Sequence, residues 1–138
     1  MMKIKYDFNI IKFISMFESL TKASVKDCFV QDDKLVFVVK ENQIGKALGK
    51  GGSNIRKLEN MIKKKIKIIE FNPDLIEFVR NVVAPLKTAD ISEEDGVVKI
   101  IPVDSQTRGL LIGRGAVNLR GFENIVKRYF EIKEIKVV

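Results

Sequence analysis

The sequence predicts an α/β fold of the α+β kind, in which one order of elements, α-β-β-α-α-β, occurs twice. The chain has 138 residues, 46% of them apolar, which suits one domain of ordinary size or two small ones. Helical and strand spacings of apolar residues alternate in the same order in both halves. A glycine-rich segment of the first half also recurs in the second. We therefore expect one domain over residues 1–71 and another over residues 72–138.

The recurring segment reads IGKALGKGGSNIR at 44–56 and RGLLIGRGAVNLR at 108–120. At an offset of 64 positions, residues 45–60 and 109–124 share seven identities among 16 aligned positions. The identical pairs are Gly45/Gly109, Gly49/Gly113, Gly51/Gly115, Asn54/Asn118, Arg56/Arg120, Glu59/Glu123 and Asn60/Asn124. Internal duplication is the best account of this similarity. Before its final strand realigns, the second copy is expected to carry about five extra residues in its last helix.

In the first half, Asp7 is the expected N-cap of a helix whose apolar residues run at helical spacing from Ile10 to Leu20. The expected later elements are a strand at 24–30, a turn at 31–33, a strand at 34–40, a helical turn at 43–48, a glycine loop at 49–52, a helix at 53–65 and a strand at 66–71.

In the second half, Asn72 is the expected N-cap of a helix with Pro73 at its first position, where proline is favoured. This helix should end just before Pro85. The expected later elements are a strand at 86–92, a turn at 93–96, a strand at 97–103, a helix at 105–112, a loop at 113–116, a helix at 117–130 and a strand at 131–138.

The net charge of +7 is concentrated around the two glycine loops. Residues 43–67 contain eight cations and one acid, Glu59, whereas residues 105–130 contain five cations and one acid, Glu123. The remaining residues carry a net negative charge. Basic residues gathered at two repeated loops indicate a polyanionic partner.

Composition and spacing exclude most catalytic and cofactor sites. With no histidine and a single cysteine, Cys28, the chain cannot form Cys/His zinc sites, histidine-activated nucleophiles or an internal disulfide. We expect Cys28 to be a buried, inert thiol. The acidic run at 93–95 is the candidate for a carboxylate-only metal site, although a hairpin turn is the favoured interpretation. We expect no enzyme activity and no cofactor.

The glycine spacing also fits neither of two common nucleotide-binding motifs. A P-loop needs four residues between its glycines, whereas three separate Gly45 from Gly49. The dinucleotide fingerprint would need glycine at Asn54 and Asn118. The sequence therefore supports neither ATP nor NAD as a ligand.

The loop at 49–52 instead has the features of an anion-binding turn. Glycine permits positive φ and leaves room for another backbone to approach. A helix that starts near Ser53 directs unpaired N–H groups at the loop, and Lys50 adds a charge at its tip. The alternative, that the glycines only end one helix and start the next, is weakened by the repeat.

Two further alternatives concern charged residues near the loops. Lys63, Lys64 and Lys65 are also explained as a solvated helix end that complements the helix dipole. Arg56 and Arg120 have the i, i+3 spacing for ion pairs with the glutamates at 59 and 123.

At these residues the sequence resembles KH domains, whose helix–GXXG–helix unit binds single-stranded nucleic acid. The first copy matches with Gly49-Lys50-Gly51-Gly52, followed by Ile55. The second copy reads Gly113-Arg114-Gly115-Ala116, followed by Leu119. Its final alanine departs from the pattern, and we expect it to be sterically mild because the position opens the next helix.

Each half has its extra helix and strand before the shared β-α-α-β unit, as in the type II form of the domain. The resemblance therefore implies two tandem type II KH domains, each with a three-stranded sheet packed on helices. Such a pair resembles the archaeal NusA-like transcription factors. That likeness implies a role in transcription termination or antitermination, with single-stranded RNA as the ligand. RNA polymerase and ribosomal components are candidate further partners, and they are the surfaces on which an adaptor would act.

The residues that the resemblance implies for RNA binding lie in and beside the two loops. They are Lys46, Gly49, Lys50, Gly51, Gly52, Asn54 and Arg56 in the first copy, and Arg108, Gly113, Arg114, Gly115, Ala116, Asn118 and Arg120 in the second. A protein-interaction adaptor with weak RNA affinity and a single-stranded DNA binder are the alternatives. We expect a monomer. A cytoplasmic location without membrane contact is also expected, since no apolar run approaches the roughly 18 residues of a membrane span.

Overall fold

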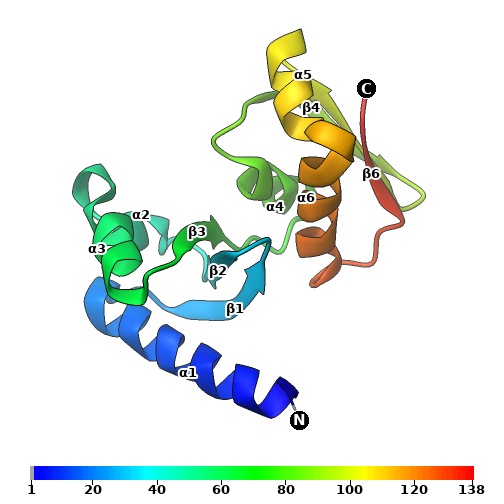
Figure 1. Ribbon diagram of the computed structural model, residues 1–138. Coiled ribbons are helices and arrows are strands. Elements are labelled where there is room, and N and C mark those ends of the chain that lie inside the picture. The colour runs from blue at the N-terminus through cyan, green and yellow to red at the C-terminus, as the bar shows by residue number, and fades with distance from the viewer. Residues whose placement is uncertain (1) are drawn as a thin grey trace. The chain divides into compact units, whose positions relative to one another are not determined.

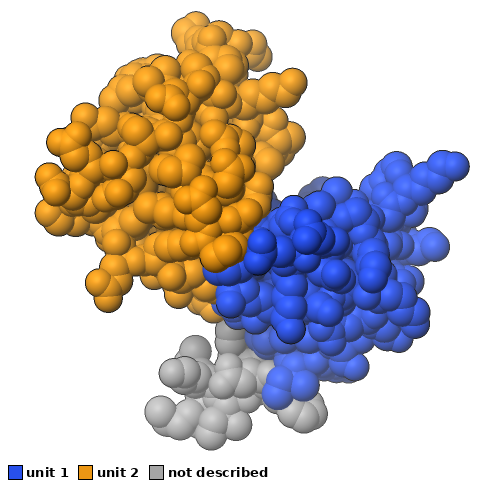
Figure 2. All heavy atoms as spheres, turned by 180° about the vertical axis from the view of Figure 1, so that it is seen from behind, with its two compact units in different colours: residues 1–71 blue, residues 72–138 orange. Residues whose placement is uncertain are grey.

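The computed structural model describes the backbone of residues 2–138 and the side chains from residue 9 onward. The chain divides into two compact units, residues 1–71 (unit 1) and residues 72–138 (unit 2), which are coloured separately in Figure 2. Unit 1 contains α1 (Met2–Thr21), β1 (Val25–Gln31), β2 (Lys34–Val39), α2 (Ile44–Leu48), the 3₁₀ turn η1 (Lys50–Gly52), α3 (Ser53–Ile62) and β3 (Lys65–Glu70). Unit 2 contains α4 (Leu75–Val83), β4 (Thr88–Glu94), β5 (Val97–Pro102), α5 (Ser105–Ile112), η2 (Arg114–Ala116), α6 (Val117–Lys127) and β6 (Glu134–Val137) (Figure 1). The predicted order of elements is confirmed in both halves.

Each unit has one three-stranded sheet, with the strand orders β1-β2-β3 and β4-β5-β6. In each sheet the first two strands are antiparallel and the last two are parallel. Parallel neighbours cannot be joined by a tight turn and need a crossover connection. The helix–loop–helix segment that contains the glycines is this crossover, so the sheet topology fixes where each loop lies.

The core of unit 1 forms between the central strand β2 and the helices. Leu35, Phe37 and Val39 lie on one face of β2 and are fully buried in this core, while the intervening Val36 and Val38 on the other face are buried as well. Phe37 stacks on Phe17 of α1, with ring centroids 4.2 Å apart. Cys28 is buried in the same core, which confirms its predicted burial.

In unit 2, α4 supplies the largest buried side chain. Phe78 contacts Tyr129 edge-on and Phe130 at a tilt, with centroid distances of 5.4 Å and 5.6 Å. These two aromatic residues follow α6, so they join the end of that helix to α4. Val98 and Ile100 of β5 are completely buried.

Two predicted helix starts are wrong. Asp7 is not an N-cap, because the backbone is already helical from Met2 and no helix breaker precedes Asp7. The helix α4 begins at Leu75 and not at Pro73, because Asp74 is extended, with φ −84° and ψ 121°. The side chain of Asn72 accepts a hydrogen bond from the Asp74 N–H at 2.8 Å, so it closes a local turn before the helix begins.

The extra residues of the second copy lie outside its last helix, which corrects the prediction. α3 has 10 residues and α6 has 11, so the two helices are nearly equal. The difference is in the connection to the last strand: β3 starts at Lys65 soon after α3, whereas β6 starts only at Glu134. Backbone N–H groups of Tyr129 and Phe130 both bond to the Val126 carbonyl, which ends α6 in a turn.

Over the part of the chain that the structure describes, every helix is too short or too polar to cross a bilayer.

Candidate nucleic-acid interface

The two glycine loops have the same backbone conformation. Gly49 has φ 70° and ψ 174°, and Gly113 has 74° and 172°. Gly51 and Gly115 both lie in the left-handed region, at φ 62° and 61° with ψ 25°. Positive φ at these positions favours glycine, so the repeated glycines are explained by the backbone path.

An asparagine in each copy ties the loop to the preceding helix. The Asn54 side-chain amide donates to the Lys46 carbonyl oxygen at 2.9 Å. Asn118 repeats this contact with the Leu110 carbonyl oxygen at 2.8 Å. Both asparagines were predicted to contact RNA, and the structure shows their side chains engaged within the loop. They hold two helices in a fixed relation across the turn.

Gly51 and Gly115 face open space. A Cβ built on either would meet nothing within 4 Å, and both residues are exposed. Lys50 and Arg114 are exposed beside them at the tips of the two loops. The predicted cation and the open glycine backbone therefore lie together in each unit, where another backbone can approach closely.

The N-termini of α3 and α6 face the loops without a side-chain cap, although their first N–H groups, those of Ser53 and Val117, bond to the Lys50 and Arg114 carbonyl oxygens. Neither helix has a side-chain cap, since Gly52 and Ala116 occupy the N-cap positions without a side-chain hydrogen bond. Uncapped first-turn N–H groups and the positive end of the helix dipole attract anions. The predicted anion-binding features thus converge at one place in each unit.

Ala116 corrects an expectation. It does not simply open α6 but adopts φ 61° and ψ 23°, the left-handed conformation that Gly52 has in unit 1. For a residue with a Cβ atom this conformation costs about 1–2 kcal/mol. The second loop therefore keeps the shape of the first in spite of an unfavourable residue.

The two repeated arginines make different contacts. Arg56 donates to the Gly51 carbonyl oxygen at 2.9 Å, so it braces the first loop. Arg120 donates to both carboxylate oxygens of Glu123, at 2.9 Å each. The predicted i, i+3 ion pair is therefore confirmed in unit 2, whereas the arginine of unit 1 bonds to the loop backbone.

The repeated glutamates have a structural role that the sequence reasoning missed. Glu59 accepts a hydrogen bond from the Ile66 N–H at 3.0 Å, and Glu123 accepts one from the Ile135 N–H at 2.7 Å. Each carboxylate thereby anchors the start of the last strand to the preceding helix. The sequence did contain a signal for this role, because glutamate occupies the same position in both copies of the repeat. An identical residue is expected where the two copies make the same contact.

The remaining predicted residues beside the loops are Lys46 and Arg108, and both are exposed. Arg108 lies on α5, whose first turn is capped by Asp104. The Asp104 side chain accepts from the Thr107 N–H at 2.7 Å, and this hydrogen bond lowers the pKa of the carboxyl. The cap fixes the start of the helix that leads into the second loop.

The acidic run at 93–95 forms the predicted hairpin turn. Glu93 and Glu94 end β4, Asp95 and Gly96 have positive φ, and the Glu93 carboxylate accepts from the Gly96 N–H at 2.8 Å. Among the described residues, no group of three or more possible His, Cys, Asp or Glu ligands is gathered for a metal ion.

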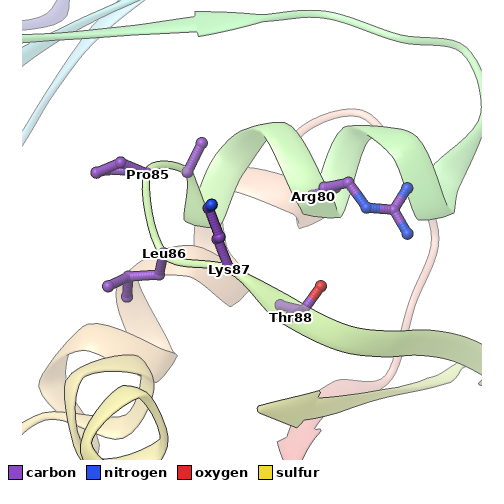
Figure 3. Close-up of a pocket in the computed structure, with 6 residues that line it drawn as sticks. Arg80, Pro85, Leu86, Lys87 and Thr88 are labelled. Atoms are coloured by element: carbon purple, nitrogen blue, oxygen red, sulfur yellow. The ribbon is translucent and has the colours of Figure 1, made fainter. Parts of the chain in front are cut away.

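Two surface hollows lie away from the loop tips. One, of about 290 Å³ in unit 1, is lined by Glu59, Lys63, Lys64 and Lys65. The other, of about 330 Å³ in unit 2, lies where α4 ends and β4 begins, and Figure 3 shows its lining residues. There the Arg80 side chain extends away from Pro85 and forms an ion pair with Glu77. Neither hollow contains a pair of carboxylates or a nucleophile with an adjacent base.

Comparison with known proteins identifies the family of the chain. The family model described as KH domain matches residues 13–85, more than half of the chain, including the first glycine loop. The probable transcription termination protein NusA of Methanococcus vannielii is 38% identical over 140 residues, which cover 99% of this chain and 81% of that protein. The protein of the same name from Methanocaldococcus jannaschii is 33% identical over 141 residues, covering 100% of this chain and 77% of that protein.

A solved structure agrees with these relatives. The crystal structure of APE1850 is similar to the chain with a TM-score of 0.75 and 27% identity, over 95% of this chain and 99% of that one. The chain belongs to the archaeal NusA-like family of KH-domain proteins.

Proposed function

We propose that the protein is a non-catalytic, single-stranded RNA-binding factor that acts in transcription termination or antitermination. Each unit is a type II KH domain, with residues 1–71 forming the first and residues 72–138 the second. The order α-β-β-α-α-β and the parallel pairing of the last two strands support this assignment in both units. RNA is the ligand through which the factor acts, and RNA polymerase or ribosomal components are its further partners. The factor acts as a monomer in the cytoplasm.

RNA phosphates lie against the glycine loops, where the positive dipole ends of α3 and α6 and the side chains of Lys50 and Arg114 favour negative charge. About four nucleotides are bound per domain, with bases over the aliphatic groove beside the helices and the central strand. Salt should weaken the complex, because several phosphates are neutralised by cations.

The observation that carries the proposal is one loop conformation formed twice, open to solvent at Gly51 and Gly115, with a cation at each tip. Gly45 and Gly109 add support. Both lie within helices, and a Cβ on either would meet nothing within 4 Å, so the fold does not require glycine there. Glycine in a helix costs about 1 kcal/mol relative to alanine. A ligand that approaches this helix face closely would account for both residues.

The test is charge reversal at each loop, with Lys50→Asp plus Gly51→Asp in unit 1 and Arg114→Asp plus Gly115→Asp in unit 2. Aspartate tolerates the left-handed conformation better than most residues, so the fold should persist. Each pair should lower affinity for a labelled RNA of about ten nucleotides, with an unchanged circular dichroism spectrum. Binding equal to that of the wild type in both variants would refute the proposal. Titration with a matched single-stranded DNA separates RNA from DNA as the ligand.

A protein-interaction role is a second candidate for unit 2. Leu110 and Val117 flank its loop and are 49% and 52% exposed, at positions where unit 1 has Lys46 and Ser53. Exposed apolar residues beside a less basic loop suit a protein contact better than a phosphate contact. In that case, protein partners captured on the wild type would persist after nuclease treatment and be lost with Leu110→Asp plus Val117→Asp.

A further inference from the structure

The turn between α3 and β3 gathers positive charge at the end of α3 opposite to the glycine loop. Lys63, Lys64 and Lys65, here called the lysine turn, are consecutive and all exposed. Lys63 takes the left-handed conformation, φ 64°, and its N–H caps α3 on the Glu59 carbonyl oxygen at 2.8 Å. The lysine turn and Glu59 line the unit 1 hollow, and the Glu59 carboxylate is already bonded to the Ile66 N–H.

Strand register adds a fourth lysine beside the lysine turn. Lys65 of β3 is the direct partner of Lys34 of β2. Burial, and secondarily the charge of Lys34, lower the pKa of the neighbouring Lys67 to about 8. Asp32 and Asp33 precede Lys34 in the turn. Even so, among the side chains that the structure describes, no ion pair is formed by Lys34 or by the lysine turn.

The fold itself does not require this cluster, as unit 2 shows. The pair in the same register there is Val97 and Glu134, one apolar and one acidic residue. The cation at the end of α6, Lys127, has its charge offset by Glu123 at 3.7 Å. The helix dipole favours a cation just after α3, but it gives no reason for Lys34 or Lys65. Like charges placed side by side destabilise a sheet. Binding of an anionic ligand therefore explains the lysine pair better than a contribution to the stability of the fold.

The lysine turn and the glycine loop are connected by one helix. α3 has 10 residues, so its ends lie about 15 Å apart. Between them the exposed residues include Lys57 and Met61, of which Met61 is 52% exposed. A single strand that leaves the loop therefore has a surface with cations and one apolar contact along α3.

We infer that the lysine turn, together with Lys34, is a second phosphate-binding site for the same RNA strand. Unit 1 then binds an RNA segment that extends beyond the nucleotides at its glycine loop. Unit 2 binds only the nucleotides at its own loop. This inference rests on the proposed RNA-binding function of the first loop. The ligand class is a single-stranded polyanion that is bound through its backbone, so the site adds length dependence and not base preference.

Neutralisation of the lysine turn tests the inference against a matched control. The test variant is Lys63→Asn, Lys64→Gln, Lys65→Gln, with asparagine chosen because it tolerates the left-handed conformation. The control is Lys12→Gln, Lys22→Asn, Lys40→Gln, which removes the same charge from exposed positions elsewhere in unit 1 and includes Lys22, also at φ 64°.

Two oligoribonucleotides, of about five and about twelve nucleotides, are titrated over a range of salt concentrations. For the longer RNA, the test variant should lose about tenfold in affinity, and the slope of log K against log salt should fall by about 2, from three lost phosphate contacts. The shorter RNA should bind both triple variants equally well. Equal losses for the test and control variants, or a loss that does not depend on RNA length, would overturn the inference.

The loop variant Lys50→Asp plus Gly51→Asp is measured in parallel. If it weakens binding of both RNAs while the lysine-turn variant matches its control, the inference fails and the proposed function stands. If it leaves both RNAs unaffected, the proposed role of the first glycine loop fails, and the inference that rests on it fails too. Should the triple variant lose helix content, the single change Lys64→Glu at an exposed position replaces it with the same length-dependent readout.

Discussion

A Cβ atom on Gly49 would lie 2.8 Å from Cγ of Asn54, because the Asn54 side chain crosses the loop to reach the Lys46 carbonyl oxygen. In unit 2 the same relationship joins Gly113 and Asn118 at 2.7 Å. The glycine and the asparagine are therefore repeated as a pair. The first is small so that the second can tie the loop to the preceding helix.

This pairing predicts strong coupling between the two residues. Gly49→Ala should destabilise unit 1 by about 2–3 kcal/mol, since alanine meets Asn54 and also adopts a conformation nearly restricted to glycine. With Asn54→Ala present, the clash with Asn54 disappears and only the Ser53 Oγ contact at 3.1 Å remains, so the cost of Gly49→Ala should fall by about 1 kcal/mol. Urea denaturation of the four proteins in this double-mutant cycle measures the coupling. Gly51→Ala, which meets no atom, is the control, and additive effects would contradict the pairing.

Ala116→Gly should stabilise unit 2. The change relieves the left-handed strain of about 1–2 kcal/mol and loses part of that gain to the larger entropy of glycine in the unfolded chain. We expect a net gain of about 0.5–1 kcal/mol, measured by thermal or urea unfolding. Ala84→Gly at an exposed residue with φ −54° should instead destabilise the protein. A loss of stability in both variants would mean that Ala116 is not strained.

Gly45→Ala and Gly109→Ala separate folding from binding. Since a Cβ meets nothing at either position, each change should leave stability unchanged or raise it by up to about 1 kcal/mol. If RNA lies against these helix faces, affinity should fall several-fold in the same variants. Calorimetry measures the change in stability, and fluorescence titration measures the change in RNA affinity. Higher stability with full affinity would show that the ligand does not approach there.

Removal of the buried glutamate should cost more in unit 2 than in unit 1. Glu123 is 5% exposed, and its carboxylate accepts the buried Ile135 N–H while pairing with Arg120 and Lys127. Glu123→Ala should lower the free energy of unfolding by about 2–4 kcal/mol. Glu59→Ala removes a partly buried bond without an ion pair, so about 1 kcal/mol is expected. A larger loss for Glu59→Ala in urea unfolding would contradict this ranking.

The lowered pKa of Lys67 predicts a pH dependence of stability. Below pH 8 the folded and unfolded states both carry the proton, and the folded state bears its unfavourable charge. Between about 8 and the ordinary value of 10.5, the folded state releases the proton first, so the free energy of unfolding should rise with pH. The rise is measured as the difference between wild type and Lys67→Met. In an NMR titration, Lys34→Ala should move the Lys67 pKa upward, and no movement would exclude Lys34 as a cause.

The order and type of the elements followed from local patterns in the sequence. The apolar run from Leu35 to Val39 predicted a strand, and glycines at fixed offsets predicted both loops, because each signal is contained within a few neighbouring residues. The errors concerned two helix starts, the length of the last helix of the second copy, and the conformation of Ala116. At Asn72, a side chain that was expected to cap a helix bonds instead within a turn, and sequence spacing does not distinguish these two outcomes.

By itself, the sequence determined the duplication, the positions of the glycine loops and the concentration of positive charge around them, since all three can be read along the chain. Only the tertiary structure decided what the repeated side chains contact. Arg56 turns to the loop while Arg120 turns to Glu123, and Lys34 meets Lys65 across a sheet. Such contacts depend on strand register and crossover geometry, which bring together atoms from separate elements. Neither can be read from the local sequence.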